Sequence, residues 1–471
     1  MRPLIIEREA DIYPLPRAVH FDDEVMRVFQ TIGISGQLKE HTLVNPGMKF
    51  LDADGGLIAD WPRPVQITAN GWNASYRFHQ PDLERLLRKR MLERSGGHVM
   101  LNHELSSVEQ NDGIALLSVV NRATGKQKNL SARFVIGCDG ANSLVRDMIG
   151  GGMTDLGFQE RWLVIDVLLK RERPDLGDFT VQHCDPNRPM TYCRNPGGRR
   201  RWEIALRNDE IESDVTNHGH IWSLLEKWIT PEDGEIERSA VYTFRSKVAN
   251  RWRLGSALIA GDAAHMTPPF LGQGMCMGIR DATNLAWKLA EVILNNVDDA
   301  LLDTYQAEQA PQALLYVETA IKLGRLIHSL DREGALTLTN QMHTGAATLR
   351  SIAPKLGKSQ VMIVKSASAE DLTGRPAAQL VIGQKAVPSD DIVGFKHLLL
   401  SKHSLKVDEN KCVVFVSDKY PEINSVLTAS GSDLVWIRPD RYVGAVVSTI
   451  DELPGSIRSL LITENGEEET Q

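Results

Sequence analysis

The chain has 471 residues, of which 42% are apolar and 24% are charged, and these are ordinary values for a globular protein. That length predicts about two to four domains, because a single hydrophobic core rarely grows past about 250 to 300 residues. The formal net charge of −8 argues against a dominant nucleic-acid surface, which would need a clustered basic face.

The cysteines and the apolar stretches indicate the compartment. The five cysteines are scattered and form no CxxC pair, so we expect free thiols in a reducing cytoplasm rather than disulfides or a metal site. No apolar run approaches the roughly 18 to 20 residues that cross a bilayer, and the N-terminus lacks the pattern of a signal peptide. One basic run, Arg199 to Arg201, follows two glycines and is typical of a solvated hairpin tip, with an anion site as the alternative.

Residues 1–157 have the pattern of the first part of an α/β domain. The predicted elements are a buried strand over 3–7, a helix over 22–34, a hairpin over 48–58, a helix over 81–94, strands within 98–120 and a buried strand over 133–137.

Beyond residue 157 the pattern changes three times. Residues 158–246 are rich in strand-forming runs, with one helix near 220–228, and predict an inserted β-rich domain that binds the substrate. The α/β pattern returns over 247–343, with a strand at 257–260 and helices over 274–294 and 303–330. We expect a linker over 344–385 and a small α/β module over 386–471.

The strongest chemical signal follows the strand at 257–260. It is the string Gly261-Asp262-Ala263-Ala264-His265, then Pro268, then Gly272-Gln273-Gly274-Met275 at the start of a helix. A strand end of this kind delivers a carboxylate that can accept a hydrogen bond from a polyol hydroxyl. The glycines let backbone approach a planar ligand, and the free N–H groups of the helix start favour negative charge on it. The alternative is a glycine-rich turn with a capping aspartate.

A second string, Gly137-Cys138-Asp139-Gly140, follows the strand at 133–137. On its own an Asp-Gly pair after a strand indicates only a turn. Paired with the first string, about 120 residues later, it gains weight as part of a cofactor site.

The two strings in this order resemble the DG and GD fingerprints of the group A FAD-dependent aromatic monooxygenases. The likeness is greatest to the 3-(3-hydroxyphenyl)propionate and phenol hydroxylase branch. Leu4 to Glu9, Pro16-Arg17-Ala18, Phe21 to Glu24 and the string from Trp436 to Val443 also resemble that branch. The resemblance therefore covers residues 1 to about 450. It implies a Rossmann-like FAD-binding domain, the inserted β-rich domain and a thioredoxin-like C-terminal module without redox cysteines.

The resemblance also implies roles for single residues. Glu7 and Arg8 would lie at the adenosine half of FAD, Arg17 and Gln80 would contact the cofactor, and Asp139 would support the pyrophosphate. Asp262, after Gly261, would hold the ribityl chain, and Gly272, Gly274 and Met275 would line the flavin ring. Structural alternatives stay open: Glu7 simply ends a strand, Arg17 pairs with a surface acid, and Gln80 caps the helix at Pro81.

The substrate side is less well defined by the sequence. His20, Tyr192, Arg194 and Pro268 are candidate contacts with an aromatic substrate, although a lone histidine or tyrosine is more often a packed or surface residue. We expect His265 to brace its loop rather than to transfer protons. No catalytic side chain is nominated.

One part of the family pattern lies outside this sequence. In the family, a strand and a glycine-rich G-x-G-x-x-G turn precede the strand that bears the glutamate, and here Glu7 stands near the start of the chain. Loss of that strand would expose unpaired backbone edges and apolar faces. We therefore expect these residues alone to bind FAD weakly and to fold poorly.

The function that the resemblance implies is hydroxylation of a phenolic ring with FAD, NADH or NADPH, and O2, through a flavin C4a-hydroperoxide. The expected partners are a small aromatic substrate and O2, with a homodimer possible. The alternatives are another flavin reaction on the same scaffold, such as halogenation or dehydrogenation, and a non-catalytic remnant that acts as a binding protein.

Overall fold

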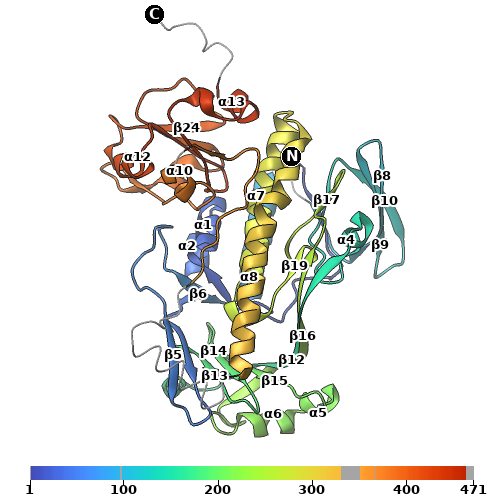
Figure 1. The fold of residues 1–471 in the computed structure, drawn as a ribbon. Coiled ribbons are helices and arrows are strands. Elements are labelled where there is room, and N and C mark those ends of the chain that lie inside the picture. The colour runs from blue at the N-terminus through green and yellow to red at the C-terminus, as the bar shows by residue number, and fades with distance from the viewer. Residues whose placement is uncertain (1, 96–97, 330–350, 366, 463–471) are drawn as a thin grey trace, which may run out of the picture.

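Figure 1 shows the arrangement in a computed structural model, which describes residues 2–95, 98–329, 351–365 and 367–462. The long helix α8 (Asp303–Ser329) runs the length of the central part. The C-terminal module lies at one end of it, and a β-rich part lies at the other. A small antiparallel sheet lies to the side and contains β8 (His103–Asn111), β9 (Ile114–Asn121) and β10 (Gln127–Ala132).

The parallel strands of the α/β part form two separate ladders. Strand β1 (Leu4–Ile6) pairs with β7 (His98–Met100). Strand β11 (Val135–Gly137) pairs in parallel with β18 (Ala257–Ile259), which continues to β17 (Arg253–Leu254). The outer edges of both ladders carry apolar side chains that are exposed, namely Leu4, Ile5 and Ile136.

Three longer helices of this part, α1 (Asp23–Ile32), α3 (Gln80–Ser95) and α7 (Gly274–Leu294), follow the sequence prediction closely, whereas α2 (Ser35–Lys39) and α4 (Leu144–Ile149) were not predicted. Helix α1 is capped by Asp22 and ends at Gly33 in the left-handed region, as acids at the start and glycine at the end predict. The short strands β2 (His20–Asp22), β3 (Thr42–Val44) and β6 (Ser75–Phe78) form one sheet.

The β-rich part is one sheet of eight strands in the order β19-β16-β12-β15-β14-β13-β4-β5. The bounds are β4 (Gly47–Leu51), β5 (Leu57–Pro62), β12 (Met153–Leu169), β13 (Thr180–His183), β14 (Met190–Arg194), β15 (Arg199–Ala205), β16 (Gly234–Ala249) and β19 (His265–Met266). The predicted hairpin β4–β5 is present, but it extends this sheet through parallel pairing with β13. Helices α5 (Glu212–Val215) and α6 (His218–Leu225) pack against one face.

The prediction of a solvated tip at Arg199 to Arg201 is wrong. These residues begin β15, and the Arg201 side chain is only 2% exposed. Its guanidinium donates to both oxygens of Asp166, at 2.7 and 2.9 Å. Arg200 and Arg201 are therefore buried within the sheet, since a charge can be buried where a carboxylate pairs with it, and Arg199 is partly exposed and pairs with Glu237.

The C-terminal module contains a five-stranded sheet in the order β20-β26-β25-β23-β24. Its elements are β20 (Ile363–Val364), α10 (Ala367–Leu372), β21 (Val381–Ile382), β22 (Val387–Pro388), α11 (Ser389–Val393), β23 (His397–Ser401), β24 (Cys412–Val416), α12 (Asn424–Ser430), β25 (Leu434–Ile437), β26 (Val443–Val447) and α13 (Gly455–Leu461). Because β20, α10 and β21 belong to the module, the predicted linker is wrong over 363–365 and 367–385, and its residues 344–350 and 366 lie outside the described ones.

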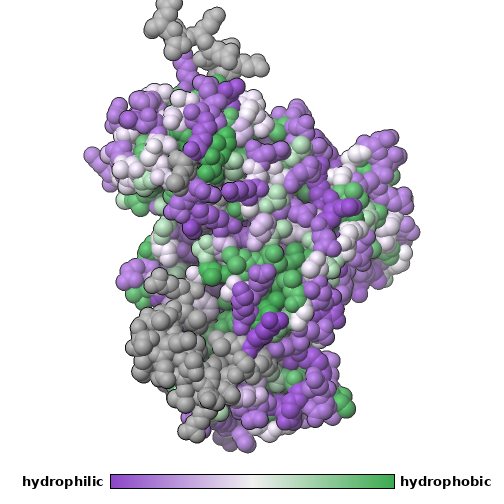
Figure 2. Space-filling view, viewed as in Figure 1, coloured by the Kyte–Doolittle hydropathy of each residue, from purple (hydrophilic) through white to green (hydrophobic). Residues whose placement is uncertain are grey.

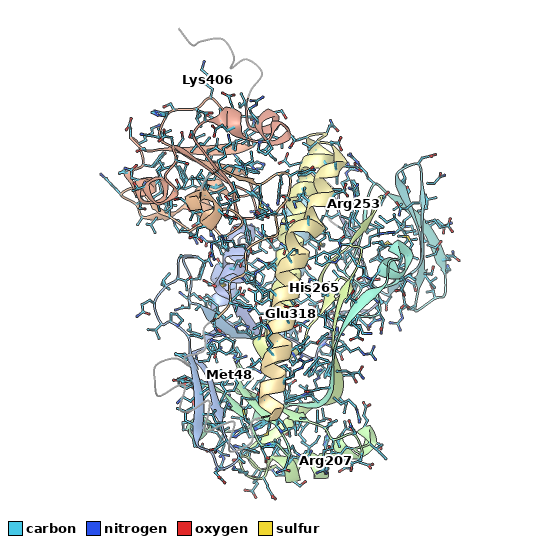
Figure 3. All side chains as sticks on the ribbon, in the orientation of Figure 1. Met48, Arg207, Arg253, His265, Glu318 and Lys406 are labelled. Atoms are coloured by element: carbon cyan, nitrogen blue, oxygen red, sulfur yellow. The ribbon has the colours of Figure 1, made fainter. Side chains whose placement is uncertain are left out.

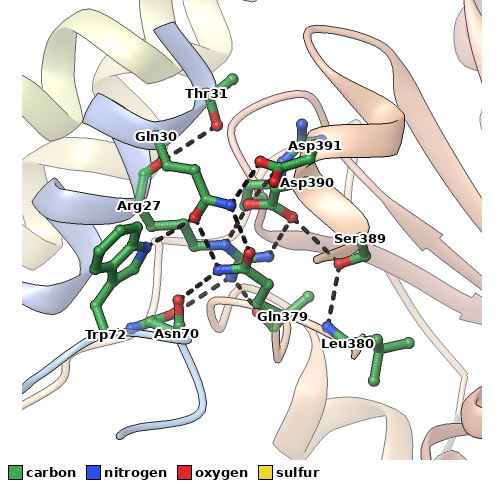
Figure 4. A network of polar contacts seen from close by, with 12 residues as sticks. Arg27, Gln30, Thr31, Asn70, Trp72, Gln379, Leu380, Ser389, Asp390 and Asp391 are labelled. Atoms are coloured by element: carbon green, nitrogen blue, oxygen red, sulfur yellow. Dashed lines mark hydrogen bonds and ion pairs between the residues drawn. The ribbon is translucent and has the colours of Figure 1, made fainter. Parts of the chain in front are cut away.

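Buried polar contacts join the module to α1, as Figure 4 shows. Arg27 donates to both carboxylate oxygens of Asp390, at 2.5 and 2.9 Å, and the two side chains are 4% and 1% exposed. One turn further along α1, Gln30 donates to Gln379 at 2.9 Å and to Asp391 at 2.7 Å. The module is therefore fixed to the α/β part by directional contacts as well as by apolar packing.

Hydrophilic residues cover most of the face drawn in Figure 2, and an apolar area lies near its middle. Within the described part of the chain, each helix is too short or too polar to cross a membrane.

Candidate functional site

The two strings singled out in the sequence meet at one edge of a parallel ladder. Gly137 at the end of β11 is the register partner of Ile259 at the end of β18. The Cys138-Asp139 and Gly261-Asp262 segments therefore leave the sheet side by side, at the carboxyl ends of the strands where α/β folds bind ligands.

The Asp262 carboxylate is available to accept hydrogen bonds from a ligand. Among the described residues no group donates a hydrogen bond to the Asp262 carboxylate, and the residue is exposed at the surface. Desolvation by the surrounding chain raises its pKa, and the nearby charges of His265 and Arg17 oppose that rise. A carboxylate that solvent can reach, yet that protein partly desolvates, is suited to accept hydrogen bonds from ligand hydroxyls.

The start of α7 offers unused donors next to that carboxylate. Gly272 has φ of 64°, and Gln273 precedes the helix without a side-chain hydrogen bond to its first turn. In contrast, Asp22 caps α1 and Ser143 caps α4 with side-chain oxygens. The first N–H groups of α7, from Gly274 and Met275 onward, are thus free of a side-chain cap and point their positive end outward.

His20 supports the Gly272 carbonyl from the other side. Burial is the main cause that lowers the pKa of His20 to about 3, and Arg77 and Arg63 add to it. The imidazole is therefore neutral at physiological pH. Its Nδ1 lies 3.1 Å from the Gly272 oxygen and can donate to it, which leaves Nε2 to accept from Ser75 Oγ at 2.8 Å.

The loop that carries Arg17 is clamped by two parts of the fold. Gln80 Oε1 accepts from the backbone N–H groups of Arg17 and Ala18, at 2.8 and 2.9 Å. From the β-rich sheet, Arg201 donates to the carbonyls of Pro16 and Arg17, at 2.5 and 2.9 Å. The Arg17 guanidinium is exposed and lies 5.0 Å from the Tyr13 ring centroid. Gln80 therefore braces this loop rather than capping α3.

The nucleotide-side candidates are engaged locally. Glu7 lies one residue beyond β1 and accepts from the Glu9 N–H at 2.9 Å. Arg8 is paired with Glu9 at 3.3 Å. Asp139 accepts from the Ser143 hydroxyl and from the Val145 N–H, so it also organises the start of α4. Their contacts with the cofactor stay predictions.

His265 braces the loop, as the sequence predicts. Its Nε2 lies 2.6 Å from Asp281 Oδ2, and the same carboxylate oxygen accepts from the Gly261 N–H at 2.9 Å. Both side chains of the pair are 1% exposed. Figure 3 places His265 between the module marked by Lys406 and the β-rich sheet marked by Met48 and Arg207.

Two substrate candidates lie away from this centre. Tyr192 packs in the apolar cluster that faces α6, and its hydroxyl donates to Gly177 O at 3.4 Å. Arg194 is on the same side of β14, because side chains alternate along a strand, and it pairs with Asp178. Pro268 is buried and precedes the turn at Pro269–Leu271. Of the four substrate candidates, His20 contacts the Gly272 carbonyl, and Pro268 belongs to the same loop.

Sequence reasoning missed Arg280, which is fully surrounded in the first turns of α7. It donates to Asp22, Glu24 and Gln273, at 2.5, 2.9 and 3.0 Å. Its signal in the sequence is a charge next to Asp281 directly after the apolar run Met275 to Ile279. A charge that is buried needs such partners.

These residues fit FAD. The uncapped start of α7 can face the electron-rich edge of an isoalloxazine ring, and Asp262 can accept from the ribityl hydroxyls. An added Cβ at Gly272 would lie 2.9 Å from His20 Nδ1, so a side chain cannot replace the glycine unless His20 or the loop moves. Fold and site together define a flavin-binding α/β protein.

Comparison with known proteins gives the family. A family model described as "FAD binding domain" matches residues 1–320, and the chain belongs to this family, whose cofactor is FAD. It is 40% identical, over 69% of its length, to the probable NADH-specific resorcinol 4-hydroxylase of Rhodococcus jostii (strain RHA1). It is 34% identical, over 70% of its length, to the 3-(3-hydroxy-phenyl)propionate/3-hydroxycinnamic acid hydroxylase of Burkholderia cenocepacia (strain HI2424). The chain spans 60% of the length of each of these relatives.

Solved structures confirm the fold. The flavin-dependent monooxygenase PieE, in complex with FAD and substrate, matches 98% of this chain and 94% of its own with a TM-score of 0.78 at 18% identity. Aklavinone-11 hydroxylase, in complex with FAD and aklavinone, matches 95% and 91% with a TM-score of 0.76 at 19% identity. The predicted α/β class with a large inserted sheet is therefore confirmed.

Proposed function

We propose that this chain acts in an FAD- and NAD(P)H-dependent monooxygenase that hydroxylates a phenolic ring. The observation that carries the proposal is the uncapped start of α7 beside the unpartnered Asp262 carboxylate. The names of the relatives supply the reaction class and favour NADH, because one of them is the probable NADH-specific resorcinol 4-hydroxylase of Rhodococcus jostii.

The side chains hold and orient rather than react. Asp262 binds the polyol of the cofactor, and the α7 amides stabilise negative charge on the ring edge that they face. Neutral His20 donates to the Gly272 carbonyl and keeps it pointing toward the imidazole, so the carbonyl does not point at the ring edge that the α7 amides face. When bound, FAD supplies hydride acceptance and oxygen activation, which no protein side chain provides.

The remaining partners follow from the same proposal. O2 and a small aromatic molecule are the co-substrates, and His20 and Pro268 are the residues that we propose near the ring. The free thiols of all five cysteines suit a reducing cytoplasm. A homodimer is the assembly that we propose.

The test is NADH and NADPH oxidation by the FAD-loaded protein across phenol, resorcinol and 3-(3-hydroxyphenyl)propionate, with each product identified by mass. We expect oxidation that at least one phenol stimulates and a product heavier by one oxygen atom. Anisole and benzene serve as controls without a free ring hydroxyl. Oxidation that no phenol stimulates, with FAD bound, would contradict the proposal.

A further inference from the structure

The string from Trp436 to Val443 brings charged side chains from the C-terminal module into the α/β part. Arg438, in the turn between β25 and β26, pairs with Glu308 of α8 at 2.9 Å, and both side chains are 0% exposed. Asp440 accepts from the Trp287 indole of α7 at 3.1 Å. This turn is therefore inserted against α7 and α8 rather than resting on the surface.

Tyr442, the last residue of that turn, reaches α1. Its side chain is buried, and its hydroxyl donates to Glu24 Oε1 in a short hydrogen bond. The other oxygen of Glu24 accepts from Arg280 Nε at 2.9 Å. Desolvation raises the pKa of the Tyr442 hydroxyl, and the Glu24 charge adds to it, so the hydroxyl stays a donor.

Arg280, which binds Glu24, also contacts the loop Gly272-Gln273-Gly274 at the start of α7. Its Nη1 donates to Gln273 Oε1 at 3.0 Å, and its Nη2 donates to Asp22 at 2.5 Å. Gln273 Nε2 also donates to Asp22, at 3.2 Å. Each hydrogen-bonding group of the Gln273 side chain is thus used to fix the residue that stands between Gly272 and Gly274.

We propose that Tyr442, Glu24 and Arg280 are positioning residues through which the C-terminal module sets the geometry of Gly272-Gln273-Gly274 at the flavin ring. The proposal rests on FAD binding at the start of α7. It gives the module a role in cofactor binding that its one cysteine, Cys412, does not suggest. Loss of one of these contacts weakens the support of the Gln273 side chain and lets the helix start shift.

The experiment compares the FAD affinity and the reduction potential of Tyr442→Phe with those of the unchanged protein. We expect a dissociation constant for FAD that is about 3- to 10-fold higher, as loss of one buried hydrogen bond to a charged group implies. The potential should become more negative, since misaligned amides stabilise the reduced ring less. Neither readout depends on hydroxylation.

Gln379→Leu is the matched control, because it removes contacts with Gln30 and Asn70 at the same interface but away from the loop. It should lower the melting temperature without changing the reduction potential. In Gln273→Leu, which interrupts the path, adding Tyr442→Phe should raise the dissociation constant no further.

Equal effects of Tyr442→Phe and Gln379→Leu on the potential, or independent effects of Tyr442→Phe and Gln273→Leu, would overturn the proposal. Unchanged FAD binding in Tyr442→Phe would overturn it and leave the proposed function standing. Absence of phenol-stimulated oxidation, with these shifts present, would overturn only the proposed function. A protein that takes up no FAD at all would overturn both.

Discussion

At the scale of single residues, loss of the Asp262 carboxylate should lower the affinity for FAD more than any other single change. We expect Asp262→Asn to raise the dissociation constant for FAD by about 10- to 100-fold, because a charge-assisted hydrogen bond becomes a neutral one or is lost. This dissociation constant is measured from the quenching of FAD fluorescence on binding. Asp209→Asn, at a side chain that is 82% exposed, is the control and should bind FAD normally.

The His265–Asp281 pair should make stability depend on pH. Burial lowers the pKa of His265, but the Asp281 carboxylate outweighs burial and leaves it above its ordinary value of 6.5. The stability gained from a histidine with a raised pKa is fully present below about pH 6.5 and is lost as pH rises through the folded-state pKa. The difference in free energy of unfolding between the unchanged protein and Asp281→Asn should therefore be larger at low pH than at high pH.

Urea unfolding at several pH values between about 5.5 and 9 tests this prediction. At the low end, the variant should be less stable by about 3 kcal/mol, the size found for breaking buried ion pairs. A difference that does not change over that range would show that the histidine is not protonated in the folded protein.

How far sequence predicts these residues depends on how local their partners are. Asp262 and Gly272 stand in one short string with the start of α7, so their proximity follows from chain order. Arg201 could not be placed, because Asp166 is 35 residues away and pairs with it only across two strands of a sheet. Arg280 depends on Asp22, 258 residues away.

At the scale of elements, the turn into α7 can be tested with a matched pair of glycines. Gly272 and Gly431 both end a helix with φ of 64° and ψ of 25°. An added Cβ at Gly431 would meet no atom within 4 Å, whereas at Gly272 it would lie 2.9 Å from His20 Nδ1. Gly431→Ala should cost about 1 to 2 kcal/mol of stability through the left-handed backbone alone.

Gly272→Ala should cost more than Gly431→Ala and should also weaken FAD binding, because His20 or the loop must move. Thermal unfolding with and without FAD separates the two effects. If both alanine variants lose the same stability and bind FAD equally well, the contact between His20 and the loop contributes neither to stability nor to FAD binding.

Elements with a local pattern were predictable, and their partners were not. The apolar spacing of 274–294 predicts α7 at both ends. The hairpin β4–β5 was also predictable from its turn, but its parallel pairing with β13 joins residues more than 130 positions apart. That pairing moves the hairpin from the first domain into the β-rich sheet, and no local pattern encodes it.

At the scale of the whole molecule, Arg27 and Asp390 fix the module to α1. Arg27→Met should lower the free energy of unfolding by about 3 kcal/mol, the lower end for a broken buried pair, because Arg441 remains 3.4 Å from Asp390 as a second partner. Calorimetry should show the module unfolding at a lower temperature than the rest. Arg458→Met, whose partner Asp451 is 77% exposed, should cost less than about 1 kcal/mol.

A single transition with an unchanged midpoint in Arg27→Met would mean that the Arg27–Asp390 pair does not stabilise the attachment of the module. The sequence predicted the module but placed its beginning too late, because β20 is only two residues long and α10 only six. Elements that short carry too little periodicity to be read without their tertiary partners.

The clamp on the Arg17 loop has a consequence for engineering. Arg201 and Arg238 donate to the Pro16 carbonyl, and Asp166 pairs with both arginines. Anyone who grafts the β-rich domain of a relative onto this scaffold, in search of a new substrate range, also replaces the residues that hold the loop of Pro16 and Arg17. Such chimaeras should retain FAD only when Arg201, Arg238 and Asp166 are kept together, so a change of substrate range in this domain has to spare these three positions.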